Sequence, residues 1–347
     1  MKRILFVDIS PLRGGAEVSL EKILERLGSG EEIFVMVPRS KSGLLNFKSA
    51  EAIREDIPLR VLADTKASLS SIFSAAFLFF KGMSIRCGQD IVVTNTFKSH
   101  ILGLGIKARN RGTKWVIYDR DVPENIFIRL LKKMLYIKSD YVIFNSLFLK
   151  RECKDPLNSE VVYNIIDIPE IRGERNFSKI LFAGNLTYEK GFDRTLQVFG
   201  EFRKRVKNAR LVAAGDEGYG HPVRHGSEED VEFIGYDIKG EYLRDAGFII
   251  LLNRRKESFS RAVAEAMLSG AVAVIMKGNG MDDYANNGNS LCFEEYDAER
   301  IADRMADAFK SGEAHEIAER GRESVKRLLD ADSTVRRLRE IFERIIL

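Results

Sequence analysis

The segment KESFSRAVAEAMLSG, residues 256–270, places two carboxylates eight residues apart. Glu257 precedes an apolar helical run, and Glu265 lies inside that run. A carboxylate is costly to bury unless a partner pairs with it. Eight helical residues span about 12 Å, and carboxylates accept hydrogen bonds from paired hydroxyls. The two acids therefore suit either the two ends of a polyol ligand or local pairing with Arg254, Arg255 or Arg261.

A short helix is expected to carry this pair. We predict it over 260–269, directly after an apolar strand at 247–252. Ser258 or Ser260 can cap its first turn, and Gly270 is well placed to end it. Glu265 then lies in the second turn of the helix, and Glu257 lies before its start.

Further candidates lie where other apolar strands are predicted to end, because parallel sheets bind ligands at the carboxyl ends of their strands. Gly14 and Gly15 open a helix whose free amides suit an anion, although a plain tight turn explains them equally well. Lys190 precedes another helix, where a cation and open amides suit a phosphate. Gly215 begins a glycine-rich loop, and Tyr236 can stack on a flat ring.

Short apolar strands alternate with amphipathic helices along the whole chain. The strands are continuously apolar, which indicates burial on both faces and hence parallel sheets flanked by helices. We expect strands at 3–9, 32–37, 59–63, 90–95, 114–119, 140–145, 160–164, 179–184, 209–215, 231–235, 247–252 and 271–276.

The series of strands and helices restarts at 179–184, after a polar segment that contains Pro169 and Gly173. The chain of 347 residues also exceeds the usual size of one hydrophobic core. We therefore predict an α/β fold of two doubly wound, Rossmann-like domains with a cleft between them. The predicted domains are residues 1–168 and 169–332, and a last helix at about 333–347 is free to pack back on the first.

Cysteine and histidine usage argues against a metal site or a disulfide framework. The three cysteines are far apart and form no CxxC motif. His221 and His225 are four residues apart, but Pro222 and Gly226 argue against a metal-binding helix there. We expect buried free thiols in a reducing compartment.

The apolar segments favour a soluble, cytoplasmic protein. The residues after Met1 read as a first strand rather than a signal peptide, because Asp8 interrupts a short apolar run. The longest apolar stretch, 71–80, is shorter than the roughly 20 residues that a membrane span requires.

Positive charge is concentrated in the first half of the chain. Residues 1–165 carry 26 Lys and Arg against 18 Asp and Glu, whereas the remainder carries 29 against 33. A basic half suits an anionic partner such as lipid headgroups or phosphates, or it is a solvated positive face.

The segment 127–138 combines basic and apolar residues and bears on whether the partner is a membrane. Arg129, Lys132 and Lys133 flank an apolar stripe. The stripe consists of Phe127, Leu130, Leu131, Met134 and Leu135. Either the stripe packs on the sheet and leaves a solvated basic edge, which we favour, or the helix lies peripherally and reversibly on an anionic membrane.

Taken together, the motifs resemble those of the group 1 (family 4) retaining glycosyltransferases of the GT-B fold. In chain order they are Gly14–Gly15, VVYNIID at 161–167, GNLTYEKGFD at 184–193, AGDEG at 214–218, FIGY at 233–236 and the pair Glu257 and Glu265. The resemblance extends over nearly the whole chain.

The resemblance implies that a sugar is transferred, with retention of configuration, from a nucleotide-diphosphate-sugar. The donor would lie mainly on the C-terminal domain. The N-terminal domain would grip a hydroxyl acceptor, which is a glycan, a lipid-linked glycan or a small molecule. The resemblance implies no metal, no cofactor and no nucleic-acid partner.

The resemblance also implies roles for single residues. Glu257 would hold the hexose of the donor and Glu265 its ribose. Lys190 and Gly15 would stabilise the diphosphate leaving group as charge develops on it. The implied donor-binding residues are Gly14, Gly15, Asn185, Lys190, Gly215, Tyr236, Glu257, Phe259, Ser260 and Glu265.

The sequence departs from the family pattern at three places. One is ESFS, 257–260, which has serines where the family most often has glycines. Asn185 stands where the family usually has arginine, so one of two diphosphate cations is missing. The stretch YDRDVPEN, 118–125, lacks the histidine usual near this point, and Asp119, Arg120 or Asp121 is the replacement. The catalytic candidates are Glu257, Lys190, Asp119 and Arg120.

These departures leave other functions open. The chain can be a non-catalytic relative that binds a nucleotide-sugar or serves as a partner subunit. A phosphorylase or an epimerase of the same fold is a further alternative, because the fold alone does not fix the chemistry.

Overall fold

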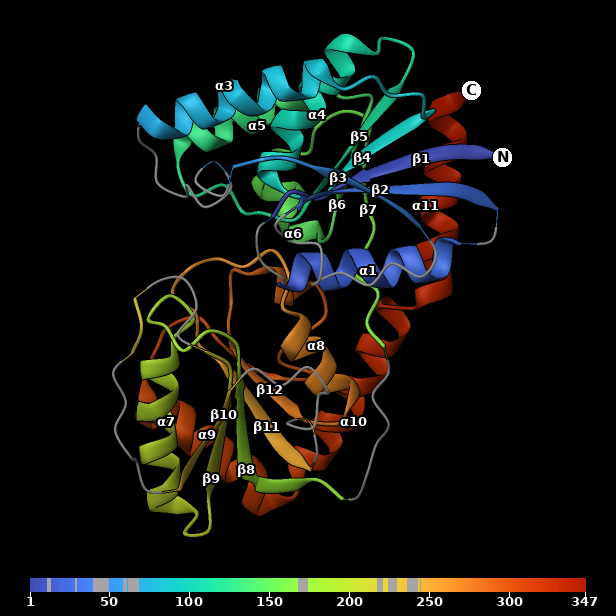
Figure 1. Ribbon diagram of the computed structural model, residues 1–347. Helices are drawn as coiled ribbons and strands as arrows, with labels where there is room; N and C mark the ends of the chain where they lie inside the picture. Colours follow the sequence, from blue (N-terminus) through green and yellow to red (C-terminus); the bar gives the residue numbers. More distant parts are fainter. Residues whose placement is uncertain are drawn as a thin grey trace. The chain divides into compact units, whose positions relative to one another are not determined.

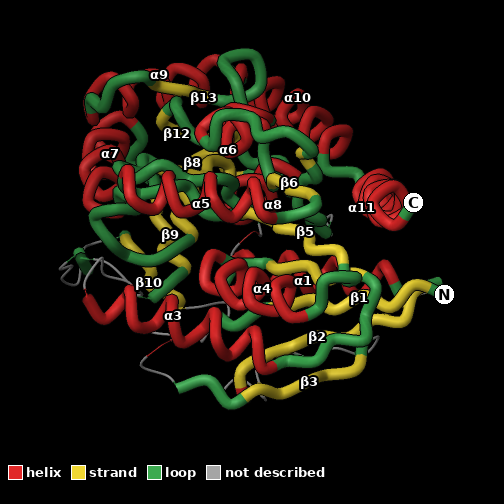
Figure 2. Tube along the Cα trace, turned by 90° about the horizontal axis from the view of Figure 1, so that it is seen from above, coloured by secondary structure: helices red, strands yellow, loops and turns green. Residues whose placement is uncertain are grey.

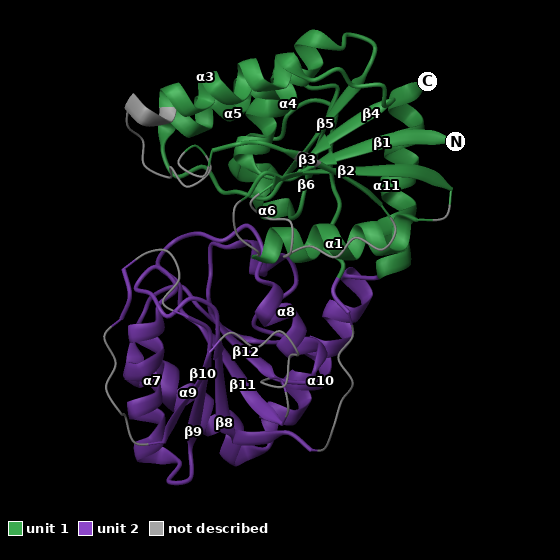
Figure 3. Cartoon of the chain, viewed as in Figure 1, with its two compact units in different colours: residues 1–165, 331–347 green, residues 166–330 purple. Residues whose placement is uncertain are grey.

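The computed structural model (Figure 1) describes residues 1–10, 14–28, 30–39, 50–58, 61, 69–167, 174–216, 221–223, 230–235, 243 and 245–347. The chain forms two compact units (Figure 3). Unit 1 comprises Met1–Ile165 and Ala331–Leu347, and unit 2 comprises Ile166–Asp330. The predicted boundary at 168/169 lies outside the described residues.

Unit 1 is built on a parallel sheet with the strand order β3-β2-β1-β4-β5-β6-β7. Its strands are β1 (Lys2–Val7), β2 (Glu31–Pro38), β3 (Glu51–Glu55), β4 (Ile91–Thr94), β5 (Lys114–Asp119), β6 (Tyr141–Phe144) and β7 (Ser159–Val161). Its helices include α1 (Gly15–Leu27), α3 (Leu69–Ser84), α4 (Phe97–Arg109), α5 (Ile126–Lys138), α6 (Leu147–Glu152) and α11 (Ala331–Ile346).

The sheet of unit 1 is covered on both faces, which is why its central strands are mostly apolar. Successive side chains of a strand point to opposite faces. Ile4 and Phe6 of β1 therefore join a core with α1 and α11. Leu5 and Val7 join a second core, to which α3, α4, α5 and α6 contribute.

Unit 2 has a second parallel sheet with the order β10-β9-β8-β11-β12-β13. Its strands are β8 (Asn176–Ala183), β9 (Arg210–Ala214), β10 (Val231–Gly235), β11 (Ala246–Leu251), β12 (Val272–Met276) and β13 (Leu291–Phe293). Its helices include α7 (Phe192–Arg205), α8 (Arg261–Leu268), α9 (Ala298–Ser311) and α10 (Glu313–Leu328). The predicted α/β fold with two doubly wound parallel sheets is confirmed.

The structure differs from the sequence prediction at the sheet edges. Strands β3 and β13 are not predicted, and each pairs with only one neighbour. Most of the strand predicted at 59–63 lies outside the described residues. Edge strands are short and polar in many proteins, so they give a weaker pattern than the buried strands between them.

Helix α5 also differs from its prediction. We expect the apolar stripe of this helix to pack on the sheet and its lysines to be solvated. In the structure Phe127, Leu130 and Met134 are exposed, whereas Lys132 is only 2% exposed. The lysine is buried because Asp119, at the end of β5, pairs with it.

Candidate functional site

Two loops that are distant in sequence meet in unit 2. The strand order reverses direction between β8 and β11, which lie side by side in the sheet. In doubly wound sheets, ligands bind at the carboxyl ends of the strands at this switch point. The loops that leave β8 and β11 carry Lys190 and Glu257, which are 67 residues apart along the chain.

Lys190 and Glu257 form an ion pair at this switch point. The Lys190 ammonium donates to Oε1 of Glu257. The glutamate side chain is 13% exposed and the lysine 35%, so both remain accessible. Gly191 lets the loops approach, because its φ is 73° and a Cβ there would collide with the carbonyl oxygen of Leu252.

The chain around Glu257 is held by polar contacts to the loop after β12. The side chain of Asn279 accepts from the Glu257 amide at 2.9 Å and from Asn253 Nδ2 at 2.9 Å. The Gly280 amide donates to the Glu257 carbonyl at 2.8 Å. These contacts fix the backbone, so the Glu257 carboxylate is presented from an ordered loop.

Helix α8 begins and ends as predicted. Ser260 is its N-cap, and its hydroxyl accepts from the Val263 amide at 3.5 Å. Gly270 follows the helix with a φ of 91°. Tyr284 further anchors the start, because its hydroxyl donates to the Ser260 carbonyl at 2.9 Å and its ring packs on Phe259.

The second carboxylate of the opening segment has a local partner. Glu265 lies in α8 and accepts from Arg261 Nη2 at 3.0 Å, one turn earlier. Its side chain is 21% exposed. The sequence allows these acids either to bind a polyol ligand or to pair with nearby arginines. In the structure Glu265 pairs with Arg261, whereas Glu257 pairs with Lys190.

Two further predicted residues of unit 2, Asn185 and Gly215, lie at the same sheet edge. Asn185 is half-buried in the loop after β8. The Gly215 amide, after β9, donates to the carbonyl of Gly235 at 2.8 Å, and a Cβ on Gly215 would collide with Gly184. Tyr236 lies outside the described residues.

In unit 1, Gly14 and Gly15 precede and begin α1, as predicted. Gly14 is the N-cap residue, and its amide donates to the Glu17 carboxylate at 2.7 Å. A carboxylate of the chain itself thus occupies the position expected for an anion, since helix N-termini attract negative charge. Glu17 is 3% exposed.

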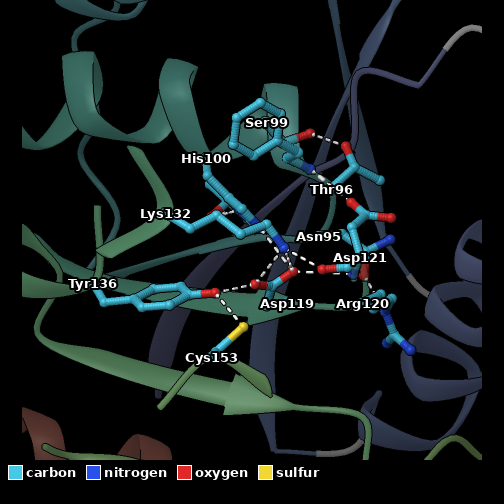
Figure 4. A network of polar contacts seen from close by, with 12 residues as sticks. Asn95, Thr96, Ser99, His100, Asp119, Arg120, Asp121, Lys132, Tyr136 and Cys153 are labelled. Atoms are coloured by element: carbon cyan, nitrogen blue, oxygen red, sulfur yellow. Dashed lines mark hydrogen bonds and ion pairs between the residues drawn. The ribbon is translucent and has the colours of Figure 1, made fainter. Parts of the chain in front are cut away.

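A buried polar network surrounds the end of β5 (Figure 4). The Lys132 ammonium lies 2.7 and 2.8 Å from the two carboxylate oxygens of Asp119 and also donates to the Asp121 carbonyl. The Tyr136 hydroxyl donates to Asp119 and contacts Cys153 Sγ at 3.3 Å. Burial alone would raise the pKa of Asp119, but Lys132 and these hydrogen bonds hold it below its ordinary value.

Asp119, one of the predicted catalytic residues, is enclosed by this network. Its side chain is 0% exposed, and its oxygens bind Lys132 and Tyr136. The carboxylate thus links the end of β5 to α5.

His100 belongs to the same network. Its Nδ1 lies 2.9 Å from Thr94 Oγ1, and its Nε2 lies 4.0 Å from the Asp119 carboxylate. Burial lowers the pKa of His100 to about 3, although the Asp119 charge opposes this shift. The imidazole is therefore neutral at physiological pH.

Arg120 links this network to the neighbouring strands. Its Nε donates to Asn95 Oδ1 at 2.7 Å, and Nη1 donates to Asn164 Oδ1. Its guanidinium also lies 3.9 Å from the ring centroid of Tyr118. Asn95 in turn donates to Asp8 at 2.9 Å, beside the switch point between β1 and β4. A cation is thus fixed at the carboxyl edge of this sheet.

Within the described part of the chain, no cluster of histidine, cysteine or acidic residues is arranged to hold a metal ion. In the same residues, no helix has the length and apolar character needed to cross a bilayer.

Several residues of these sites are absent from the sequence prediction. Lys132 is predicted only as part of a basic edge, and His100, Asn95 and Asn279 are not predicted at all. Asn279 follows β12, so inspection of that strand end would have found it. The burial of His100 and Lys132 has no comparable signal, because it depends on residues brought together by the fold.

The residues of unit 2 match a known protein family. Residues 165–324 match the family of group 1 glycosyl transferases, and this span corresponds closely to unit 2. A curated relative from Klebsiella pneumoniae, an uncharacterised 42.6 kDa protein in the cps region, is 28% identical over 163 residues. That match spans 46% of this chain and 41% of the relative's length.

Solved structures are similar over nearly the entire chain. HepE of Anabaena in complex with UDP-glucose covers 99% of this chain at 18% identity, with all of that chain covered and a TM-score of 0.77. Sucrose-phosphate synthase of Thermosynechococcus elongatus matches at 14% identity over 99% of both chains, with a TM-score of 0.78. The chain therefore has the GT-B fold, and its residues 165–324 carry the sequence pattern of the group 1 glycosyl transferases.

Proposed function

We propose that the chain is a glycosyltransferase that uses a nucleotide-diphosphate-sugar donor, a hydroxyl acceptor and a retaining mechanism. The acceptor is a glycan, a lipid-linked glycan or a small molecule, and the reaction takes place in the cytoplasm. The observation that carries the proposal is the accessible Lys190–Glu257 pair at the switch point of unit 2. It lies within the residues that match the group 1 family. HepE, which has the same fold, is in complex with UDP-glucose.

Each member of the pair has a chemical role in this proposal. Breaking the bond between the sugar and the diphosphate leaves negative charge on the leaving group, and the Lys190 ammonium stabilises that charge. The Glu257 carboxylate accepts hydrogen bonds from sugar hydroxyls. In the structure each side chain neutralises the other, so the donor takes the place of this ion pair when it binds. The positive charge of Lys190 makes a metal or cofactor unnecessary in this proposal.

The loop after β5 serves the acceptor side in this proposal. The cation on this side is the guanidinium of Arg120, and its hydrogen bonds to Asn95 and Asn164 hold it in place. Asp119 is a positioning residue, since Lys132 and Tyr136 bind it in the interior. Glu265, which is paired with Arg261 in α8, binds the ribose of the donor.

Replacement of Glu257 tests the proposal. Glu257→Ala removes the carboxylate that accepts hydrogen bonds from the donor sugar. We expect turnover to fall by about 100-fold or more, which is the order found when one stabilising group is lost. Release of nucleoside diphosphate is measured with a panel of nucleotide-sugars and acceptors. The matched control is Glu313→Ala, which breaks another ion pair of unit 2, with Arg304 at 2.7 Å, and leaves turnover intact.

Two results separate the proposal from its alternative. Unchanged turnover in Glu257→Ala would contradict the assignment of this residue. Binding of a nucleoside diphosphate without turnover on any donor would favour a non-catalytic binding protein, which Asn185 and the absent histidine leave open. The anomeric configuration of the product, determined by NMR, tests the retaining mechanism.

A further inference from the structure

Helices α3, α4 and α5 form one layer on the sheet of unit 1. Figure 2 shows them side by side, with α4 in the middle, and α4 packs against both neighbours. Their inner sides contribute Leu78, Leu102 and Leu135 to the core. The outer sides of α3 and α5 are consequently free to contact something other than the sheet.

These outer sides carry large apolar residues. Phe73 on α3 is 74% exposed, and Phe127 on α5 is 76% exposed. Among the described side chains, the exposed large apolar residues are Ile72, Phe73, Phe77, Phe80 and Met83 on α3, and Ile126, Phe127, Leu130, Met134 and Ile137 on α5. Spacings of three and four residues place such side chains along one face of a helix. Large exposed apolar surface on a helix is typical of an interaction site.

The charges of this layer have a single sign. Within α3, α4 and α5 there is no aspartate or glutamate, whereas lysine or arginine occurs on all three. In the described part of the chain, four of these cations pair with acids outside the layer, namely Lys81, Lys107, Arg129 and Lys132. Lys133 and Lys138 are exposed beside the apolar residues of α5, and no ion pair of theirs occurs within the described residues.

Unit 2 provides an internal comparison. Its helix α9 carries three acids among its basic residues, Glu299, Asp303 and Asp307. Its one strongly apolar exposed residue, Phe309, is 36% exposed. A helix layer without acids and with two rows of exposed apolar residues is therefore not a general property of this chain.

We propose that the outer face of α3 and α5 docks on an anionic lipid bilayer. Apolar side chains enter the boundary between headgroups and acyl chains, and basic residues contact the phosphates, as in interfacial amphipathic helices. A second copy of the chain is a poor occupant, because a symmetric dimer would place the same basic face against itself. The proposal concerns peripheral contact and does not depend on the proposed function.

Vesicle binding by paired variants tests the proposal. Wild-type protein is co-sedimented with mixed phosphatidylcholine–phosphatidylglycerol vesicles and with pure phosphatidylcholine vesicles. We expect stronger binding to the mixed vesicles. The double variant Lys133→Gln, Lys138→Gln is expected to bind mixed vesicles more weakly at low salt, by about five-fold for each lysine removed. Phe73→Ser with Phe127→Ser weakens it by about ten-fold or more, and the loss persists at about 1 M salt, where exposed charges are screened.

Matched controls use unit 2. Lys310→Gln with Lys326→Gln removes the same charge from exposed positions, and Phe309→Ser removes an exposed phenylalanine. Both control variants are expected to bind vesicles like the wild type, because they do not change the outer face of α3 and α5. Equal binding to the two vesicle types, or unchanged binding by either test pair, would overturn the proposal. The proposal would also be overturned if the wild type is a dimer in sedimentation velocity and the double variant Phe73→Ser, Phe127→Ser is a monomer.

Discussion

Asp119 and Lys132 are charged residues buried beside each other, and His100 lies next to them. A buried ion pair is strongly destabilised when one partner is lost, because the other charge remains without compensation. His100 avoids a further buried charge by remaining neutral, with its pKa lowered by burial from 6.5 to about 3. Above pH 6.5 it is neutral in the folded and unfolded chain and does not affect stability. Between these two pH values the unfolded chain binds a proton that the folded chain excludes, so the free energy of unfolding decreases as the pH is lowered.

His100→Asn tests this pH dependence. Asparagine can keep a partner for Thr94 Oγ1 but binds no proton. We expect wild type to lose about 2 kcal/mol more of its unfolding free energy than the variant between about pH 6 and pH 4. Denaturation is followed by the fluorescence of Trp115, the one tryptophan of the chain, whose Nε1 donates to Thr94 at 3.1 Å. Parallel pH profiles for the two proteins would exclude His100 as the titrating group.

At the scale of elements, α3 and α4 are packed backbone to backbone. A Cβ on Gly82 would collide with the carbonyl of Leu102, and one on Gly105 would collide with the carbonyl of Phe79. Glycine inside a helix costs roughly 1 kcal/mol relative to alanine. Glycine nevertheless occurs at both positions, because only glycine permits this close approach of the two helices.

Gly105→Ala therefore has the opposite effect from alanine in an open helix. We expect it to lower the unfolding free energy of unit 1 by about 1–3 kcal/mol, because the helices must move apart. The control is Gly200→Ala in α7, where no atom lies within 4 Å of an added Cβ, and which should raise stability by about 0.5–1 kcal/mol. Chemical denaturation of both variants measures the two changes. Stabilisation by Gly105→Ala would disprove the close approach.

The same scale shows what could be predicted from the sequence. Buried parallel strands such as β5 and β11 have a continuous apolar pattern, and the ends of α8 are marked by Ser260 and Gly270. Lys190 and Glu257 could be placed at strand ends, because doubly wound sheets bind ligands there. That they pair with each other could not be predicted, since it depends on β8 and β11 being neighbours. The burial of Lys132 could not be predicted either, because its partner lies on another element.

At the scale of the whole molecule, the chain passes twice between the units. It leaves unit 1 after Ile165 and returns at Ala331. Helix α11 then packs Phe342 into the core beside Phe6, with ring centroids 6.4 Å apart. Glu160 of β7 holds the helix from outside the core, because it pairs with Arg337 at 2.7 Å and also with Arg344.

Phe342→Ala measures how much unit 1 depends on this returning helix. Phe342 is fully buried, so we expect a loss of about 3–5 kcal/mol of unfolding free energy. The Trp115 fluorescence transition reports the loss, since Trp115 belongs to unit 1. Phe309→Ala on α9, a partly exposed residue of unit 2, serves as the control and leaves that transition unchanged. A small effect of Phe342→Ala would mean that unit 1 is stable without α11.

The return of α11 has a consequence for synthesis on the ribosome. All of unit 2, Ile166–Asp330, is translated before the helix that completes unit 1. Domains generally fold as units, with the N-terminal one first, but here the second unit is complete while the first still lacks one covering helix. The apolar side chains that α11 buries, among them Ile4 and Phe6, stay uncovered during that interval. The first unit of the nascent chain therefore exposes part of its core until α11 has been made.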